Sequence, residues 1–262
     1  MEPVIHLRDA VVVLGRFPAL AGASLEVARG EIVLLQGPNG AGKTTLLKLC
    51  AGLLPVSRGE ASVLGVDLTT DRRAIRSRVG LLGHDNGLYE DLSVAEYVRF
   101  WGRTVGASAS EIDAALARLG LAGRLAGTAV GRLSAGQRRR TALAALVARR
   151  PELWLLDEPH AGLDAEGRDL IDELLRTAAA AGATVVVASH ERERAAGLAQ
   201  RAVAVDGGLV FESGPPAAGA PTDVPIERSP AGEPVPPTAP ATPATPATPA
   251  APAIEPAGVV PC

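Results

Sequence analysis

A glycine-rich segment between two apolar segments constrains this chain more than any other feature of its sequence. Residues 37–45 read GPNGAGKTT and match the pattern G-x-x-x-x-G-K-[ST]. The apolar run EIVLLQ at 31–36 comes directly before it and predicts a buried strand. Residues 43–54 follow with leucines at helical spacing. The sequence therefore predicts a strand, a tight glycine loop and a helix, in that order.

The composition of this loop suits a bound phosphate. Glycines let the backbone wrap closely, so that successive N–H groups and the helix N-terminus point at phosphate oxygens. Lys43 is predicted to reach the β and γ phosphates, and the hydroxyl of Thr44 to ligate Mg²⁺. Only two of the 26 basic residues are lysines, which makes the lysine at 43 more informative; a glycine-rich helix start without a ligand is the weaker alternative. The predicted nucleotide-binding residues of the loop are Gly37, Pro38, Asn39, Gly40, Ala41, Gly42, Lys43, Thr44 and Thr45.

Two acids end a second apolar run. Residues 153–156 read LWLL, and Asp157 and Glu158 follow directly. A carboxylate at the end of such a strand lies near the phosphates, so Asp157 is predicted to hold Mg²⁺. Glu158 is predicted to orient or deprotonate the attacking water. A strand that is simply capped by acids is the alternative.

A third motif, LSAGQ at 133–137, precedes an arginine-rich stretch at 138–150 that predicts a helix. Ser134, the backbone N–H groups and the helix N-terminus can together bind an anion. Taken alone, this pentapeptide is more often a serine-capped helix.

The remaining pattern predicts an α/β fold with a mainly parallel sheet. Further short apolar runs occur at 79–82, 184–188 and 202–205, several of them separated by helical stretches. Residues 92–132 show helical patterning without a strand signal. We therefore expect a helical subdomain at about 85–150, inserted between the early and the late strands.

The last fifty residues differ in composition from the rest. Residues 213–262 hold 15 of the 21 prolines, and Ala-Thr-Pro repeats run through 241–249. Such a segment cannot bury enough apolar surface to offset its ordering entropy. We therefore expect one domain at 1–212 and a disordered tail rich in Pro, Ala and Thr at 213–262.

Charge and cysteine content restrict the partners and the compartment. Four acids and one base lie beyond residue 212, which leaves 25 acids and 25 bases in the body. A neutral body argues against a strongly cationic nucleic-acid surface. No apolar run reaches eighteen residues, the first residues lack a secretory pattern, and there are only two cysteines. These features predict a cytoplasmic location.

With the three motifs in this order, residues 1–212 resemble the ATP-binding-cassette (ABC) ATPases. The resemblance implies a P-loop NTPase cassette with an N-terminal antiparallel β portion and a helical subdomain, and it implies ATP and Mg²⁺ as ligands. It also implies that His190 contacts the γ-phosphate and that the loop at 161–164 passes between two sites. In the family the signature motif acts on ATP bound to the opposite subunit, which here concerns Ser134, Gly136 and Gln137.

The same resemblance implies the partners. They are a second ATP-binding subunit, in a homodimer or with a similar chain, and one or more integral-membrane permease subunits. The chain is then expected on the inner face of the cell membrane as a peripheral protein. No nucleic-acid partner is expected.

Two positions depart from the family pattern. Family members usually place an adenine-stacking aromatic where this chain has Leu14, so Phe17 is the candidate replacement. His84 stands where the family usually has a glutamine that touches the metal and the attacking water. This histidine and Trp154 are similar to the ATPase subunit of cytochrome c haem exporters. His160 is interpreted as an ordinary surface residue.

Two other classes of protein remain as alternatives. One is a soluble ABC-type ATPase that acts on nucleic acid or ribosomes, although such proteins usually carry two cassettes or long inserted arms. The other is a nucleotide-binding regulator without turnover, which Glu158 disfavours.

Overall fold

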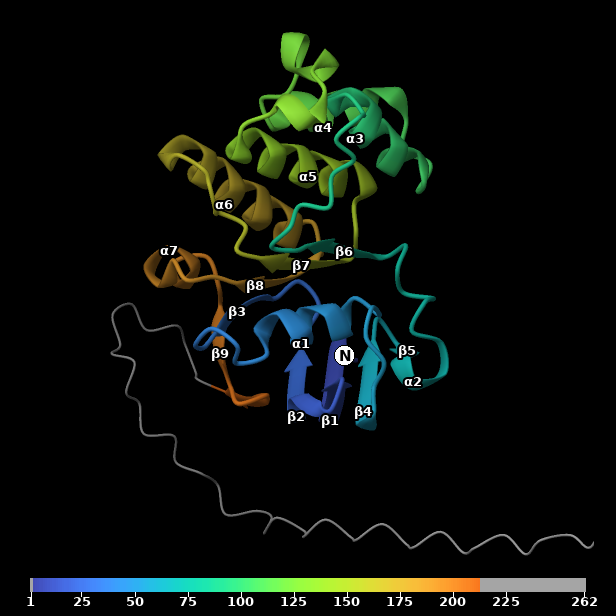
Figure 1. The fold of residues 1–262 in the computed structure, drawn as a ribbon, viewed down its shortest axis with the longest axis vertical. Coiled ribbons are helices and arrows are strands. Elements are labelled where there is room, and N and C mark those ends of the chain that lie inside the picture. The colour runs from blue at the N-terminus through green and yellow to red at the C-terminus, as the bar shows by residue number, and fades with distance from the viewer. Residues whose placement is uncertain (1, 213–262) are drawn as a thin grey trace, which may run out of the picture. The chain divides into compact units, whose positions relative to one another are not determined.

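The structure is a computed structural model, and it describes residues 2–212. The predicted tail at 213–262 lies outside the described residues. The described part contains two sheets, one helix between them and further helices on the outer face of the larger sheet (Figure 1).

The smaller sheet is antiparallel, with strand order β2-β1-β4-β5. In its first strand, Ile5, Leu7, Ala10 and Val12 are buried, and they form the face of the strand that packs in the core. This sheet confirms the expected N-terminal antiparallel portion. Its strands are β1 (Ile5–Leu14), β2 (Phe17–Val27), β4 (Arg58–Val63) and β5 (Val66–Asp67).

The larger sheet has the order β10-β9-β3-β8-β7-β6 and is parallel except for its last strand, β10. Each of the predicted apolar runs forms one of its strands. They read as continuous apolar runs because parallel strands are buried on both faces. The strands are β3 (Ile32–Gln36), β6 (Val79–Leu82), β7 (Leu153–Asp157), β8 (Thr184–Ala188), β9 (Arg201–Asp206) and β10 (Leu209–Glu212).

Successive side chains of the larger sheet point to its two opposite faces, and each face packs in a separate hydrophobic core. Leu153 and Leu155 pack toward the smaller sheet and helix α1 (Lys43–Cys50), whereas Trp154 and Leu156 pack toward the outer helices. Helix α1 lies between the two sheets (Figure 1). It ends at Cys50 rather than at the predicted residue 54, because Gly52 already has the left-handed φ of 67°.

The predicted helical stretch is present on the outer face of the larger sheet. Both of its first two helices begin with a capping box, Ser93 with Glu96 and Ser108 with Glu111. No helix among residues 2–212 is both long enough and apolar enough to cross a membrane. The helices are α3 (Val94–Arg103), α4 (Ala109–Arg118), the 3₁₀ turns η1 (Gly123–Gly127) and η2 (Val130–Arg132), α5 (Ala135–Arg149), α6 (Ala165–Ala180), and the short α2 (Leu68–Asp71) and α7 (Arg192–Ala196).

Candidate nucleotide site

The glycine loop connects β3 to α1 at the carboxyl edge of the larger sheet. Gly37 begins the loop with a φ of 146°, and a Cβ there would lie 2.0 Å from the carbonyl oxygen of Val205. Only glycine can therefore turn the chain at this point. The loop ends at Gly42, which directly precedes the N-terminus of α1.

Lys43 is folded into this loop. Its ammonium group donates to the carbonyl oxygens of Gly37 and Pro38 at 2.7 and 2.9 Å. The residue is buried although it carries a charge, so its donors are held over the loop by backbone oxygens. A phosphate oxygen can replace either carbonyl as an acceptor.

Thr44, in the first turn of α1, meets Asp157 at the end of β7. The hydroxyl of Thr44 donates to the Asp157 carboxylate at 2.7 Å. Hydroxyl and carboxylate oxygens are the hard ligands that Mg²⁺ prefers, and this ion usually takes only one or two protein ligands beside phosphate oxygens and water. The pair fits that requirement. Within residues 2–212 no group of three or more His, Cys, Asp or Glu side chains could hold a metal ion.

Glu158 follows at the end of β7 and lies against the loop after β8. Its carboxylate accepts from the backbone N–H of His190 at 3.2 Å, and the His190 Nε2 atom lies 3.6 Å from it. The backbone of Glu158 has a φ of 53°, which is uncommon for a residue other than glycine. Such a conformation turns the chain sharply after the strand, and the carboxylate lies against His190.

These groups surround one hollow of about 640 Å³. Its wall includes most of the predicted site, together with Pro18, Ala19, Gly207 and Gly208, which were not predicted. Gly37, Pro38 and Ala41 are not part of this wall. The predicted residues in the wall are Asn39, Gly40, Gly42, Lys43, Thr44, Thr45, His84, Asp157, Glu158 and His190.

Phe17 lies beside this hollow and is not part of its wall. The residue begins β2 opposite Leu14, and 79% of its surface is exposed. Its neighbours Pro18 and Ala19 do line the hollow. Stacking of Phe17 on adenine stays a prediction.

The signature motif lies outside the hollow. Ser134 caps α5, its hydroxyl accepts from the Gln137 N–H at 3.2 Å, and its own N–H donates to the Gln137 side chain at 3.0 Å. Gly136 lies so close to the loop at 161–164 that an added Cβ would be 2.9 Å from the carbonyl oxygen of Gly162. The serine-capped helix is therefore present, and Ser134 at its N-terminus is exposed and outside the hollow.

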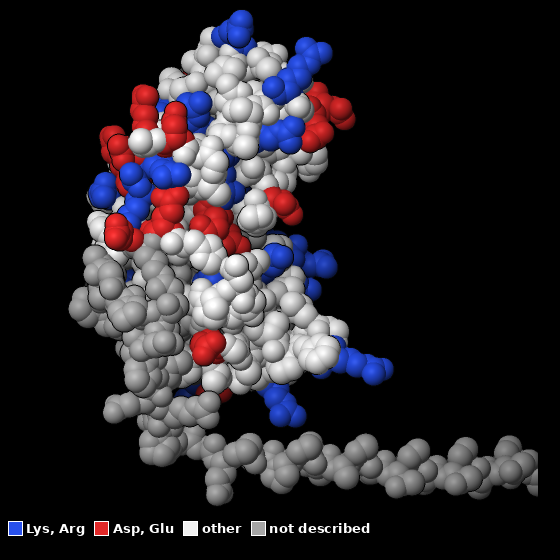
Figure 2. Space-filling model, turned by 60° about the vertical axis from the view of Figure 1, so that its left-hand side comes forward, with Lys and Arg blue, Asp and Glu red and all other residues white. Residues whose placement is uncertain are grey.

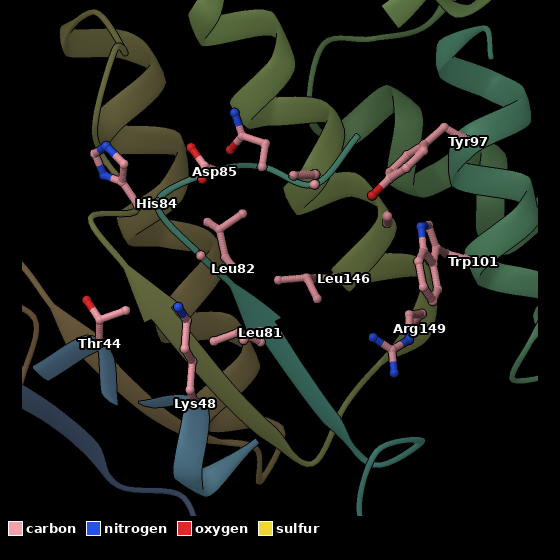
Figure 3. A pocket seen from close by; sticks show the side chains of 15 residues that line it. Thr44, Lys48, Leu81, Leu82, His84, Asp85, Tyr97, Trp101, Leu146 and Arg149 are labelled. Atoms are coloured by element: carbon pink, nitrogen blue, oxygen red, sulfur yellow. The ribbon is translucent and has the colours of Figure 1, made fainter. Parts of the chain in front are cut away.

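His84 lies between the hollow and a second depression, the helical groove of about 400 Å³. In Figure 3, Thr44 and Lys48 of α1 stand on one side of this groove and Tyr97 and Trp101 of α3 on the other. His84 is exposed and belongs to the walls of both depressions. Like Thr44, which lines both depressions as well, it can therefore contact both a nucleotide and anything bound in the helical groove.

Two residues outside the predicted set are buried next to the site. Arg139, from the arginine-rich helix, is 3% exposed and donates to backbone carbonyls of Asp157, Glu158 and Gly83. The arginine run was visible in the sequence, but nothing in it distinguished this position from its neighbours.

His160 is the second buried residue outside the predicted set, and its interpretation as a surface residue was wrong. It is 1% exposed, and its Nε2 atom donates to the Asp172 carboxylate of α6 at 2.8 Å. Arg194 of α7 donates to the same carboxylate at 2.6 Å. Burial alone would raise the pKa of Asp172, but the hydrogen bonds and charges of His160 and Arg194 outweigh burial and hold the pKa below its usual value. This network attaches the loop at 161–164 to the segment that follows His190.

Replacing Asp172 should therefore destabilise the fold. Asp172→Ala leaves the buried His160 nitrogen without its acceptor, and we expect the free energy of unfolding at neutral pH to fall by about 2–4 kcal/mol. The control is Asp169→Ala, since Asp169 also accepts from Arg194 at 2.8 Å but is exposed; its effect should stay within about 0.5 kcal/mol. Urea unfolding of the variants measures both.

The pH dependence follows from the direction of the Asp172 pKa shift. A carboxyl whose pKa is lower in the folded protein stabilises it above the unfolded pKa, and loses that effect as pH falls through the folded pKa. The stability difference between wild type and Asp172→Ala should therefore shrink in acid. Equal stability of the two proteins at neutral pH would contradict the assignment of this network.

The fold and the site together define a class of protein. A strand, glycine loop and helix, with Lys43 and Thr44 close to an acid at the end of β7, make a P-loop nucleoside triphosphatase. Comparison with known proteins narrows this class, because residues 20–161 match the family described as ABC transporter.

Several relatives of similar sequence share one name. The cytochrome c biogenesis ATP-binding export protein CcmA of Xanthomonas campestris pv. campestris (strain 8004) is 42% identical over 190 residues, which are 72% of this chain and 87% of that protein. The protein of the same name from Paramagnetospirillum magneticum is 40% identical over 193 residues, which are 72% of this chain and 88% of that protein. A solved dimeric structure of MJ0796, a bacterial ABC transporter cassette, matches with a TM-score of 0.73 at 26% identity, over 79% of this chain and 96% of that chain.

The chain therefore belongs to the ABC transporter family, as one of its ATP-binding subunits. It binds ATP and hydrolyses it to drive a membrane transporter. Homologues in this family work with membrane permease components, and the MJ0796 cassette forms a dimer.

Proposed function

We propose that this chain is the ATPase of an exporter for cytochrome c biogenesis and that the exported compound is haem. The proposal depends on two observations taken together. One hollow brings the glycine loop together with Asp157, Glu158 and His84, and Trp154 lies in the same strand as Asp157. The chain is also about 40% identical to two proteins named for cytochrome c biogenesis export. The ATP site supports the motor, and the relatives' names support the cargo.

The residues of the hollow divide the reaction among them. Lys43 exchanges the carbonyls of Gly37 and Pro38 for oxygens of the β and γ phosphates. Thr44 and Asp157 would hold Mg²⁺, which neutralises charge that develops on the transferred phosphoryl group. Glu158 orients or deprotonates the attacking water, and His190, 3.6 Å from it, contacts the γ-phosphate.

The second half of each site comes from a second subunit. Ser134, Gly136 and Gln137 lie at the exposed start of α5, outside this chain's own hollow. The helix N-terminus and the serine hydroxyl suit a phosphate of ATP bound elsewhere. We propose a homodimer in which two hollows are each closed by the partner's signature motif, as the family resemblance implies. The dimeric MJ0796 cassette supports this arrangement.

A permease would contact the chain at the helical groove. Beside this groove, Tyr89 and Phe100 are 53% and 49% exposed, and they form ring contacts with each other and with Tyr97 and Trp101. Exposed aromatic side chains of this kind are typical of protein–protein contacts. Docking there would place the chain on the inner face of the membrane, in the cytoplasm.

The alternative of an ATPase that acts on nucleic acid has less support. On the face drawn in Figure 2, acidic and basic side chains are interspersed, and neither sign covers the surface. A nucleic-acid ligand favours a continuous basic surface.

Deletion of the gene in its own organism tests the proposed cargo. We expect c-type cytochromes, detected by haem staining of membrane proteins, to disappear and to return when the wild-type gene is supplied. The amounts of b-type cytochromes, measured in the same membranes, serve as the control for haem synthesis. Normal c-type cytochromes in the deletion strain would contradict this cargo and leave the ATPase itself in place.

A further inference from the structure

Arg139 holds an unusual set of hydrogen bonds for a buried cation. The residue lies in the first turns of α5 and is 3% exposed. Its Nη1 atom donates to the Gly83 carbonyl at 2.8 Å and to the Asn86 side-chain oxygen at 2.7 Å. Its Nη2 atom donates to the carbonyls of Asp157 and Glu158. Each of these acceptors is a neutral oxygen, so the guanidinium holds backbone and amide groups in place rather than forming an ion pair through these hydrogen bonds.

The acceptors belong to two segments that are far apart in the sequence. Gly83 and Asn86 flank His84 in the loop after β6, whereas Asp157 and Glu158 end β7. Arg139 itself belongs to the helix that Ser134 caps. One planar side chain therefore connects the loop of His84, the segment of Glu158 and the signature helix.

The Glu158 segment needs such support. Its left-handed backbone, with a φ of 53°, is strained for a residue other than glycine and persists only when its surroundings hold it. The Glu158 N–H is fixed by the Ala188 carbonyl at 2.8 Å, and the Glu158 carbonyl is fixed by Arg139. The direction of the carboxylate thus depends on both contacts.

The charge of Arg139 persists at neutral pH. Burial lowers its pKa to about 10, and the nearby charges of Asp157 and Glu158 act in the opposite direction. A guanidinium that stays charged donates through its full planar set of N–H groups.

From this geometry we propose that Arg139 is a positioning residue that ties the Glu158 carboxylate to the loop of His84. When that loop moves, as on docking of a partner in the helical groove, the guanidinium transmits the movement to the end of β7. The inference rests on the proposed role of Glu158 in hydrolysis. Arg139 touches neither nucleotide nor water in this assignment, and it acts only through the backbone.

Arg139→Lys tests this assignment in the full chain. A lysine keeps the charge but has a compact ammonium group, which cannot donate to both segments in one plane. A displacement of about 1 Å at the reacting groups can cost about 100-fold in rate, so we expect kcat to fall by about 10- to 100-fold. The KM for ATP should stay within about threefold, because the glycine loop and Lys43 are unchanged.

Two controls accompany this variant. Arg140→Lys makes the same substitution at the next position of the helix, which is partly exposed, and should leave kcat unchanged. Glu158→Gln, measured in parallel, tests the proposed role of Glu158 itself. If Glu158→Gln hydrolyses ATP normally, the proposed function of Glu158 fails; if only Arg139→Lys behaves as wild type, the positioning role alone fails.

A second variant covers the case in which Arg139→Lys folds poorly. Asn86→Ala removes one acceptor on the loop side without disturbing the buried cation, and it should lower kcat by about three- to tenfold at unchanged KM. In the Arg139→Lys background it should have almost no further effect, since coupled residues are not additive. A rise in KM that matches the loss of kcat in either single variant would overturn the proposal. So would equal effects of Asn86→Ala in both backgrounds.

Discussion

Glu158→Gln is expected to bind ATP normally and to hydrolyse it at least about 100 times more slowly than the wild type. The glutamine keeps the size of the side chain and its hydrogen bond from the His190 N–H, which is 3.2 Å long in the wild type. It cannot accept a proton from water, and it carries no charge. Contacts to the phosphates come from the glycine loop and Lys43, so binding should not change.

Three measurements test the expected behaviour of Glu158→Gln. Release of phosphate gives kcat, equilibrium binding of ATP gives the affinity, and a sizing column detects a dimer that traps ATP. Glu166→Gln is the matched control, since Glu166 lies exposed in the first turn of α6 and should behave as wild type. Turnover by Glu158→Gln at the wild-type rate would show that another group activates the water.

The parts of the site that were predictable are those in which chemistry and local structure coincide along the chain. The loop at 37–45 has its strand before it and its helix after it, and Asp157 and Glu158 follow directly on the strand that presents them. These strands could be predicted without an alternation of apolar and polar residues. Parallel strands are buried on both faces, so their sequences are continuous apolar runs. The local sequence was therefore sufficient to predict both the elements and the positions of these residues in them.

The parts that were missed depend on contacts between distant segments. Pro18, Ala19, Gly207 and Gly208 line the same hollow from opposite ends of the chain, joined where the Ala21 N–H donates to the Gly208 carbonyl at 2.8 Å. Only the packing of the smaller sheet against β10 brings them there.

Dependence on distant segments also explains why the buried positions of Arg139 and His160 were not predicted. Arg139 is one of three consecutive arginines, and helix α5 turns only this one inward to carbonyls of two other segments. His160 follows a proline in a polar loop, a setting that favours exposure, yet Asp172 of α6 holds it in the core. Neither orientation follows from local propensity, because each is fixed by a tertiary partner.

Lys43→Ala is expected to lose most of its affinity for ATP. In the wild type the ammonium group donates to the carbonyls of Gly37 and Pro38, so it already lies over the loop that would hold the phosphates. A hydrogen bond from a charged group contributes about 1.5–3 kcal/mol, and the lysine can make more than one to the β and γ phosphates. Loss of about 3 kcal/mol corresponds to a Kd for ATP raised by about 100-fold or more.

The chain provides its own matched control, since Lys48 is its other lysine. Lys48 lies one turn and a half further along the same helix, is exposed, and lines the helical groove rather than the hollow. Lys48→Ala removes the same charge from the same helix, so it should keep the Kd for ATP within about threefold of wild type. Calorimetric titration with ATP gives both constants, and thermal melting of each variant shows whether the loop still folds. A folded Lys43→Ala protein that binds ATP as tightly as Lys48→Ala would mean that the backbone N–H groups of the glycine loop bind the phosphates without the lysine.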